Sequence, residues 1–401
     1  MSDARPASSP PMLPRLLYIA DVPVENSLHG SALLYRLLLD YPRDRLRIVE
    51  TGAQQSLPHR RLPGVDYRHV PQRMGRLRRT RLAKLVDSVA MVGAAHVSRA
   101  IRTATIGFDA DAVLTVTNGN GWLSAVAFAR AQKLPYHLIC HDEWAGGGAT
   151  LAALAAMKER IFAQAYRGAA SRLCVSPAMG AAYQRRYGVA GETLYPARSP
   201  HGQVYEGLSP RLAAGACGRV VAFAGSMSTL AMVEANRRMA QAIAPLGGRL
   251  IIYGPATVEA HPSLAQPNIE LRGLLPPDAL VAALRNDVDI LYLPMWFGPG
   301  EKVNERLSFP SKLTDYTNVG LPIFVSGDAD CAAAVWERDH PGVALVQHST
   351  AIPDIAADMQ KLFEDRQLAR SLAERAKAVG DIMFAATTAE QSFYRTLTHR
   401  S

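Results

Sequence analysis

Short apolar runs alternate with stretches of helical periodicity from residue 15 almost to the end of the chain. A short apolar run without polar alternation indicates a strand that is buried on both faces, and strands that alternate with helices indicate a parallel sheet. We therefore expect an α/β protein. In the helix expected at 77–102, Leu82, Leu85, Val86 and Val89 form a one-sided apolar stripe. In the first half of the chain the expected strands are 15–20, 46–50, 112–116, 136–140 and 172–175, and the other expected helices are 31–40, 121–132 and 150–167.

A break in this pattern at 195–218 divides the chain into two halves. The break contains Pro196, Pro200 and Pro210 and several glycines, which is typical of a connection between domains. A chain of 401 residues also exceeds one ordinary core and fits two domains. We expect a disordered lead-in at 1–14, an N-terminal domain at 15–195, a linker at 196–218, a C-terminal domain at 219–384 and a final helix within 385–401. The second half has expected strands at 219–224, 249–253, 268–272, 289–293, 322–325 and 343–346, and expected helices at 228–244, 276–285, 311–319, 351–363, 367–379 and 387–398.

The charge and the cysteines of the chain indicate where it acts and what it contacts. The net charge is +9, and six basic residues without an acid stand between Arg73 and Lys84. This run favours an anionic membrane surface or an anionic acceptor over nucleic acid, because it has no interleaved aromatic residues. The four cysteines, Cys140, Cys174, Cys217 and Cys331, are scattered and indicate free thiols in a reducing compartment. With no window of about 20 apolar residues, we expect a cytoplasmic protein, peripheral to the inner face of a membrane if it binds one.

The segment from Phe309 to Val325 carries the most specific pattern. Lys312 and Asp315 stand three residues apart, so both can project from the first turn of the expected helix toward one ligand. A lysine at a helix N-terminus suits a phosphate, and the two oxygens of a carboxylate suit two neighbouring sugar hydroxyls. Phosphate beside a sugar indicates a nucleotide. Asp315 taken alone could also be an acid that the helix dipole stabilises.

The register of Asp315 with Gly320 and Pro322 resembles the donor-site signature of retaining glycosyltransferases with the GT-B fold, in the large nucleotide-sugar-dependent group that is like family 4. The resemblance implies two Rossmann-like domains that face each other across a cleft, with the C-terminal helix crossing back to the first domain. It also implies transfer of a sugar from a nucleotide sugar to a glycan, lipid-linked or other acceptor, with retention. The nucleotide sugar is then a co-substrate, and neither a cofactor nor a metal is implied.

The resemblance assigns roles to residues in both halves of the chain. Lys312 is expected to stabilise the leaving diphosphate, and His141, directly after the strand 136–140, is expected to face the transferred sugar. These two are the expected catalytic residues, and His29, Gly30 and Asp142 are expected on the acceptor side. The expected donor-binding residues are Gly225 and Ser226 at the diphosphate, Arg272, Gly273 and Leu274 at the base, and Ser311 and Asp315 beside Lys312.

Two positions depart from the family pattern. The loop from Gly225 to Thr229 has no cation, although many members carry one there. We therefore expect Lys302 or Arg306 to assist Lys312 at the phosphates. Leu307 stands where the family has the first of two glutamates, so Glu301 or Glu305 is expected to replace that glutamate at the donor.

Other functions remain open at this point. A nucleotide-sugar 2-epimerase has the same fold, and a non-catalytic GT-B module could bind a sugar nucleotide or a glycan. A dinucleotide dehydrogenase is disfavoured, because residues 16–30 lack Gly-x-Gly-x-x-Gly. The pair Asp109 and Asp111 precedes a strand and is interpreted as a turn, and we find no spacing of His, Cys and carboxylate residues that predicts a metal site.

Overall fold

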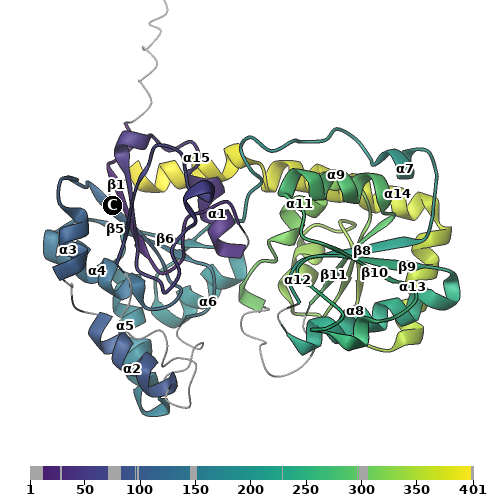
Figure 1. Ribbon diagram of the computed structural model, residues 1–401, viewed down its shortest axis with the longest axis horizontal. Helices are drawn as coiled ribbons and strands as arrows, with labels where there is room; N and C mark the ends of the chain where they lie inside the picture. Colours follow the sequence, from purple (N-terminus) through teal and green to yellow (C-terminus); the bar gives the residue numbers. More distant parts are fainter. Residues whose placement is uncertain are drawn as a thin grey trace, which may run out of the picture. The chain divides into compact units, whose positions relative to one another are not determined.

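The computed structural model describes residues 12–27, 29–70, 83–94, 96, 99–144, 151–227, 229–295, 297 and 306–398. The chain forms two compact units (Figure 1). Unit 1 comprises Met1–Leu194 and Glu390–Ser401, and unit 2 comprises Tyr195–Ala389. The segment 196–218, which we expected as a linker, belongs to unit 2 by its contacts. Glu301, Lys302 and Glu305 lie outside the described residues, as does the basic run apart from Lys84.

Unit 1 contains a parallel sheet of seven strands in the order β3-β2-β1-β4-β5-β6-β7. The neighbouring strands run parallel throughout, so every connection crosses over the sheet. The strands are β1 Leu16–Ala20, β2 Leu46–Glu50, β3 Asp66–His69, β4 Ala112–Val116, β5 Tyr136–Cys140, β6 Ser171–Cys174 and β7 Glu192–Thr193. The helices are α1 His29–Leu38, α2 Ala83–Ala94, α3 Arg99–Thr105, α4 Gly121–Gln132, α5 Ala155–Gly168 and α6 Pro177–Tyr187.

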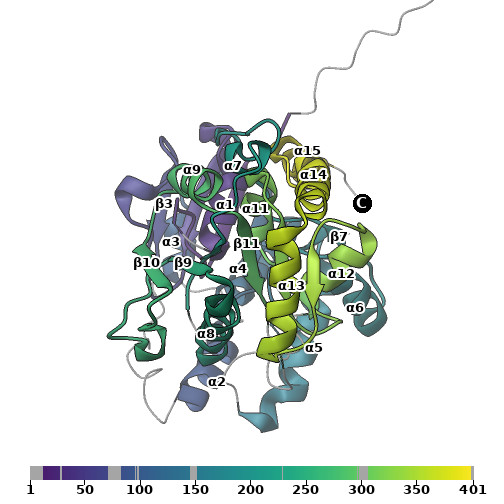
Figure 2. The same cartoon turned by 90° about the vertical axis from the view of Figure 1, so that its right-hand side faces the viewer.

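Unit 2 contains a second parallel sheet, with six strands in the order β10-β9-β8-β11-β12-β13. Figure 2 shows its helices from the side. The strands are β8 Val220–Ala224, β9 Arg249–Tyr253, β10 Ile269–Gly273, β11 Ile290–Pro294, β12 Ile323–Ser326 and β13 Leu345–Gln347. The helices are α7 Pro210–Ala213, α8 Leu230–Ile243, α9 Pro277–Asp287, α11 Lys312–Val319, α12 Ala332–Asp339, α13 Ile352–Glu364 and α14 Arg366–Met383.

Helices cover both faces of the sheet in unit 2, which explains why its central strands read as continuous apolar runs. The strands β8 and β11 are buried at every residue. Alternate residues of β8 enter two different cores: Val221 and Phe223 pack against α8 and α13, while Val220 and Ala222 pack against α9, α11, α12 and α14. A strand between two such layers needs apolar side chains on both faces.

The final helix, α15 Ala386–Thr398, ends the chain within unit 1. There the ring of Tyr394 meets the ring of Tyr41 edge to face, with 5.7 Å between their centroids. Phe393 in the same helix is fully buried. These contacts confirm the expected return of the C-terminal helix to the first part of the chain, and the two parallel sheets confirm the expected α/β class.

Several elements differ from the sequence-based expectation. The helix expected at 77–102 is, in its described part, two helices, α2 and α3. The stripe expected on it is wrong in part: Val86 is buried, but the side chains of Leu85 and Val89 are about half exposed, at 49% and 50%. The helix buries Met91 instead, so its packed face is rotated from the expected one. Strands β3 and β7 and helices α6, α7 and α12 were not predicted.

Candidate functional site

Helix α11 is fixed beneath the carboxyl ends of β8 and β11 by its buried face. Leu313, Tyr316 and Val319 are at most 1% exposed and pack into the core. The Tyr316 hydroxyl accepts a hydrogen bond from the Ala224 N–H at 2.9 Å and donates one to the Tyr292 carbonyl at 3.1 Å. Burial raises the pKa of Tyr316 well above its ordinary value, so it stays a donor at any physiological pH. With this face occupied, Lys312 and Asp315 lie half-buried on the remaining surface of the helix.

The side chain of Lys312 lies directly on the backbone of Gly225, which follows β8. A Cβ atom at residue 225 would lie 2.3 Å from Lys312 Cε and 3.1 Å from Nζ. The ammonium is also 5.3 Å from the centroid of the Phe223 ring, within reach of a cation–π contact. The structure therefore brings together Gly225 and Lys312, two of the residues that the sequence placed at the diphosphate.

A second glycine, which the sequence-based reasoning missed, completes this arrangement. Gly254 follows β9, and a Cβ atom there would lie 2.0 Å from the carbonyl oxygen of Gly225. Both residues have φ near +155°, at +152° and +158°, a region that side chains rarely enter. The ends of the adjacent strands β8 and β9 thus approach each other without side chains between them. The sequence signal that could have predicted this approach was a glycine directly after each of the two strands.

The first-turn amides of α11 are already occupied. The N–H of Leu313 donates to the Pro310 carbonyl at 3.0 Å, and the N–H of Thr314 donates to the Ser311 carbonyl at 3.2 Å. Ser311, expected at the donor, is half-buried. Ser226, which follows β8, is also half-buried. The positive charge at this end of the helix therefore resides mainly in the Lys312 side chain rather than in these two amides.

The residues expected at the base lie at the end of β10. The Arg272 guanidinium is paired with Glu270 at 2.6 Å and Asp287 at 2.7 Å, and the hydrogen bond that it donates to Glu270 is the main reason that its pKa is raised. Gly273 has φ +70° and accepts a hydrogen bond from the Gly254 N–H at 2.9 Å, while Leu274 is 56% exposed. With the guanidinium engaged, a ligand at this edge would meet backbone groups of 273 and 274.

The remaining donor residues expected from the loop before α11 are only partly described. Arg306 is half-exposed and forms an ion pair with Asp330. Leu307, in place of a glutamate, is half-buried. Glu301, Lys302 and Glu305 lie outside the described residues. Within the described part of this loop, then, the only cation is already paired with a carboxylate.

In unit 1, the structure brings His141 and Gly30 close together. His141 directly follows β5, and a Cβ atom at Gly30 would lie 3.1 Å from its Nδ1. Burial lowers the pKa of His141, and the adjacent Asp142 opposes that shift. The imidazole is therefore mainly neutral near pH 7. His29 begins α1, but its side chain lies outside the described residues.

A carboxylate that the sequence reasoning missed joins three strand ends in the same sheet. Asp21 follows β1 and accepts hydrogen bonds from the Thr51 hydroxyl and from the Asn120 N–H, each at 2.7 Å. A Cβ atom at Gly119 or Gly121 would lie within 2.4 Å of its carboxylate oxygens. An acid after one strand and glycines after another were visible in the sequence, but their proximity depends on the strand order.

The pair Asp109 and Asp111, interpreted from the sequence as a turn, faces arginines, and so does Asp289. Asp111 accepts a hydrogen bond from the Arg15 N–H at 2.7 Å and lies 3.8 Å from Arg45. Asp289 holds Arg211 at 3.0 Å. In the described parts of the chain, no three His, Cys, Asp or Glu side chains gather as a metal site would require.

A cavity of about 330 Å³ lies elsewhere in unit 2, between α7, α13 and α14. Its lining includes Cys217, Asp289 and Arg366, on the side of the sheet where β8 and β11 begin. The predicted donor residues stand at the opposite ends of these strands. In open α/β sheets ligands bind beyond the carboxyl ends of the strands, so we place the candidate site at Gly225, Gly254, Lys312 and Asp315 and not in this cavity.

Comparison with known proteins identifies the fold. No protein-family model matches the sequence. No curated protein matches it either. Among solved structures, HepE from Anabaena, in complex with UDP and glucose, has a TM-score of 0.64 at 16% identity, over 96% of this chain and 99% of its own. Sucrose-phosphate synthase from Thermosynechococcus elongatus has a TM-score of 0.63 at 14% identity, over 95% of this chain and 98% of its own.

WaaG, a glycosyltransferase involved in lipopolysaccharide biosynthesis, has a TM-score of 0.60 at 14% identity and covers 96% of this chain and 99% of its own. These matches span nearly the whole chain. They show that it has the GT-B fold and that it is similar in structure to nucleotide-sugar-dependent glycosyltransferases.

Proposed function

We propose that this protein is a glycosyltransferase that moves a sugar from a nucleotide-sugar donor to a glycan, lipid-linked or other acceptor. The observation that carries the proposal is the arrangement in unit 2. Lys312 lies on the bare backbone of Gly225, and Asp315 lies one turn further along the same helix, at the carboxyl ends of the strands. A cation beside bare backbone suits a diphosphate, and a carboxylate one helical turn further along suits sugar hydroxyls.

In the proposed reaction the bond between the anomeric carbon and the leaving diphosphate breaks. The acceptor hydroxyl forms the new glycosidic bond on the same face, and its proton passes to a diphosphate oxygen. Negative charge grows on that diphosphate in the transition state, where the Lys312 ammonium would stabilise it. Anomeric configuration is retained, and no step needs a metal.

His141 is proposed to contact the transferred sugar. Because burial lowers its pKa, it would hydrogen-bond a sugar hydroxyl as a neutral imidazole rather than as a cation. Gly30 leaves the space that this ring occupies, and Asp142 is proposed to orient the acceptor. His29, the first residue of α1, is also proposed for the acceptor side.

An anionic membrane surface is the proposed setting for the acceptor. Helix α2 presents Leu85, Val89 and Val92 to solvent, and these follow one another at four- and three-residue spacing on one face. In the sequence the basic run from Arg73 to Lys84 leads directly into this helix. An apolar stripe next to clustered cations suits an anionic lipid interface. No helix in the described parts of the chain has the length and apolarity to cross a membrane.

Measurements of binding and turnover together separate this proposal from the two alternatives, a nucleotide-sugar 2-epimerase and a non-catalytic binding module. HepE is known in complex with UDP-glucose, so UDP-sugars come first in a panel that also includes GDP- and ADP-sugars. A cognate donor at 100 times its Kd should stabilise the protein by about 2.7 kcal/mol. That corresponds to a Tm increase of roughly 5–10 °C for a unit of this size.

The second part of this experiment measures release of nucleotide from the donor that binds. A transferase releases nucleoside diphosphate at a rate that depends on acceptor. A nucleotide-sugar 2-epimerase would convert or hydrolyse the donor without an acceptor, and a binding module would leave it intact. If no sugar nucleotide of the panel raises the Tm, the proposed function is wrong.

A further inference from the structure

The chain passes between the two units twice, after Leu194 and after Ala389. Arg198 follows the first passage, and Phe384 precedes the second. The backbone N–H of Arg198 donates a hydrogen bond to the carbonyl of Phe384 at 2.9 Å. The two connecting segments, residues 195–200 and 382–389, are therefore joined to each other inside unit 2, close to the points where the chain leaves it.

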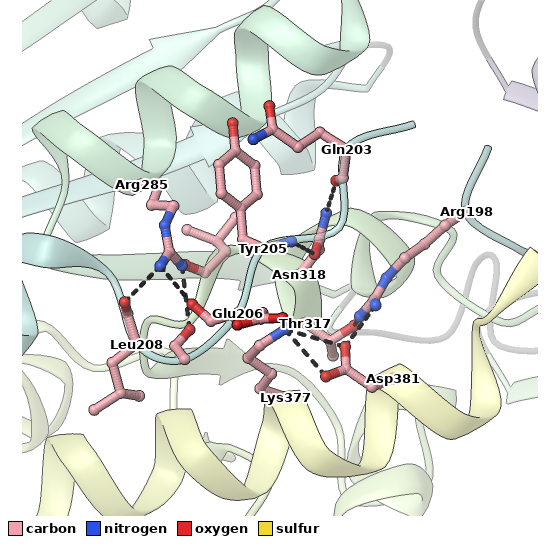
Figure 3. A network of polar contacts seen from close by, with 12 residues as sticks. Arg198, Gln203, Tyr205, Glu206, Leu208, Arg285, Thr317, Asn318, Lys377 and Asp381 are labelled. Carbon is pink, nitrogen blue, oxygen red and sulfur yellow. Dashed lines mark hydrogen bonds and ion pairs between the residues drawn. The ribbon is translucent and has the colours of Figure 1, made fainter. Parts of the chain in front are cut away.

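The side chain of Arg198 extends from this junction to helix α11 (Figure 3). Only 6% of the residue is exposed. Its Nε donates to the Thr314 carbonyl at 3.0 Å, and an Nη donates to the Thr317 hydroxyl at 2.9 Å. The other Nη pairs with Asp381 of α14 at 2.6 Å. Thr314 stands between Lys312 and Asp315 in sequence, so one guanidinium links the connecting segments to the turn that carries both candidate donor residues.

This link is rigid for two reasons. A guanidinium donates in fixed directions from a planar fork, unlike the rotating ammonium of lysine. Asp381 is also held in place by Lys377, whose Nζ lies 3.0 Å from its other oxygen. A displacement of the Arg198 backbone would leave a buried donor or acceptor unsatisfied, which is unfavourable. Movement at the connecting segments is therefore transmitted to α11 rather than absorbed by the side chain.

A second buried arginine, Arg285, holds the other end of α11, and the hydrogen bonds of its guanidinium go to residues outside 195–200 and 382–389. Arg285 donates to the Val319 carbonyl at 2.8 Å, and to the carbonyls of Glu206 at 2.9 Å and Leu208 at 2.6 Å (Figure 3). Asn318 similarly donates to the Gln203 carbonyl at 2.8 Å. These contacts fix the helix to the segment 203–208 of unit 2. Arg285 is therefore a matched control for Arg198.

We propose that Arg198 is a positioning residue that couples nucleotide binding at α11 to the two segments connecting the units. The inference rests on the proposed function, because it needs a nucleotide at Lys312 and Asp315. A ligand that holds the first turn of α11 restrains the Thr314 carbonyl, then Arg198, and through it both connecting segments. Coupling of this kind is reciprocal, so restraint of the connecting segments also raises the affinity for the nucleotide.

Hydrogen–deuterium exchange with UDP as the probe tests this coupling, with GDP as the probe if UDP does not bind. In the wild-type protein, saturating nucleotide should slow amide exchange in peptides covering 195–200 and 382–389 by at least about fivefold, the lower range of allosteric coupling. In Arg198→Lys this protection should fall below about twofold, although calorimetry shows that the sites are still saturated. Arg285→Lys should keep the wild-type protection.

The outcomes separate the two claims. If no nucleotide or sugar nucleotide of the panel binds the wild-type protein, the proposed function fails and the coupling with it. If a nucleotide binds but leaves exchange at both segments unchanged, or if Arg198→Lys keeps full protection, the coupling is wrong and the proposed function stands. Should Arg198→Lys not fold, Asp381→Asn removes one charge and leaves the guanidinium in place. It should lower the protection at 382–389 by at least half, and unchanged protection there would overturn the proposal.

Discussion

Replacement of Gly225 by alanine is expected to lower the turnover of the proposed sugar transfer by displacing Lys312. The new methyl group would lie 2.3 Å from Lys312 Cε and 3.2 Å from Phe223. Carbon atoms at their optimal separation are about 3.5–4.0 Å apart, so the lysine side chain must move by more than about 1 Å. Because the clash involves the flexible end of a lysine, the side chain moves and the strand stays in place.

The size of the effect follows from this displacement. A misplacement of about 1 Å at a reacting centre can lower the rate by about 100-fold, which matches the typical cost of losing one charge-stabilising donor. The backbone adds a separate cost, since φ +152° is unfavourable for alanine by about 1–3 kcal/mol of folding free energy. We therefore expect turnover to fall about 100-fold, with a modest decrease in Tm.

Steady-state turnover of the cognate donor, measured for single and double variants, tests this reasoning. Gly207→Ala is the control, because Gly207 also has positive φ, at +61°, but a methyl group there meets nothing within 4 Å. It should lower the Tm and leave turnover unchanged. In a Lys312→Ala background, Gly225→Ala should cost little more, since both changes act on one group. Fully additive losses would refute a mechanism through Lys312.

Three further predictions follow from the structure. His141→Ala should reduce transfer and leave nucleoside diphosphate affinity unchanged by calorimetry, and a loss of that affinity would remove His141 from the sugar. Burial lowers the pKa of His137 from 6.5 to about 4, so the unfolded chain binds more protons between these values. Stability should therefore decline by about 3 kcal/mol as the pH falls from 6.5 to 4, and His137→Gln should show a smaller decline in chemical denaturation. The wild-type protein should sediment with anionic vesicles at low salt and not at high salt. A variant with glutamine at Arg76, Arg78, Arg79 and Arg81 should sediment less, and sedimentation equal to that of the wild-type protein would contradict the membrane proposal.

The buried centre of each sheet was predictable because its physical signature is local. Strands such as β8 and β11 are apolar at every position, since helices cover both faces, and their runs stand out from the neighbouring helices. Strand β3 is Asp-Tyr-Arg-His, at the edge of its sheet, and carries no such signature. Its pairing with β2 comes from backbone hydrogen bonds that any residue can make.

The candidate site was predictable only where a motif marks it. Lys312, Asp315 and Gly225 were expected, because their types and spacing follow a recognisable pattern. Gly254, Asp21 and Arg198 were not, since each acts through partners distant in sequence: Arg198 and Thr317 are 119 residues apart. The packed face of α2 was misjudged for a similar reason, because an apolar stripe does not reveal which neighbour covers it.

The most direct test of the account is a calorimetric titration of the cognate sugar nucleotide into the wild-type protein and into Asp315→Ala. Asp315 is half-buried on a helix whose other face is packed, so its truncation should leave the fold and the Tm nearly unchanged. We expect one binding site in the wild-type protein and no measurable binding in the folded variant. Equal affinity in both proteins would show that the donor does not bind at α11 and would contradict the central claim.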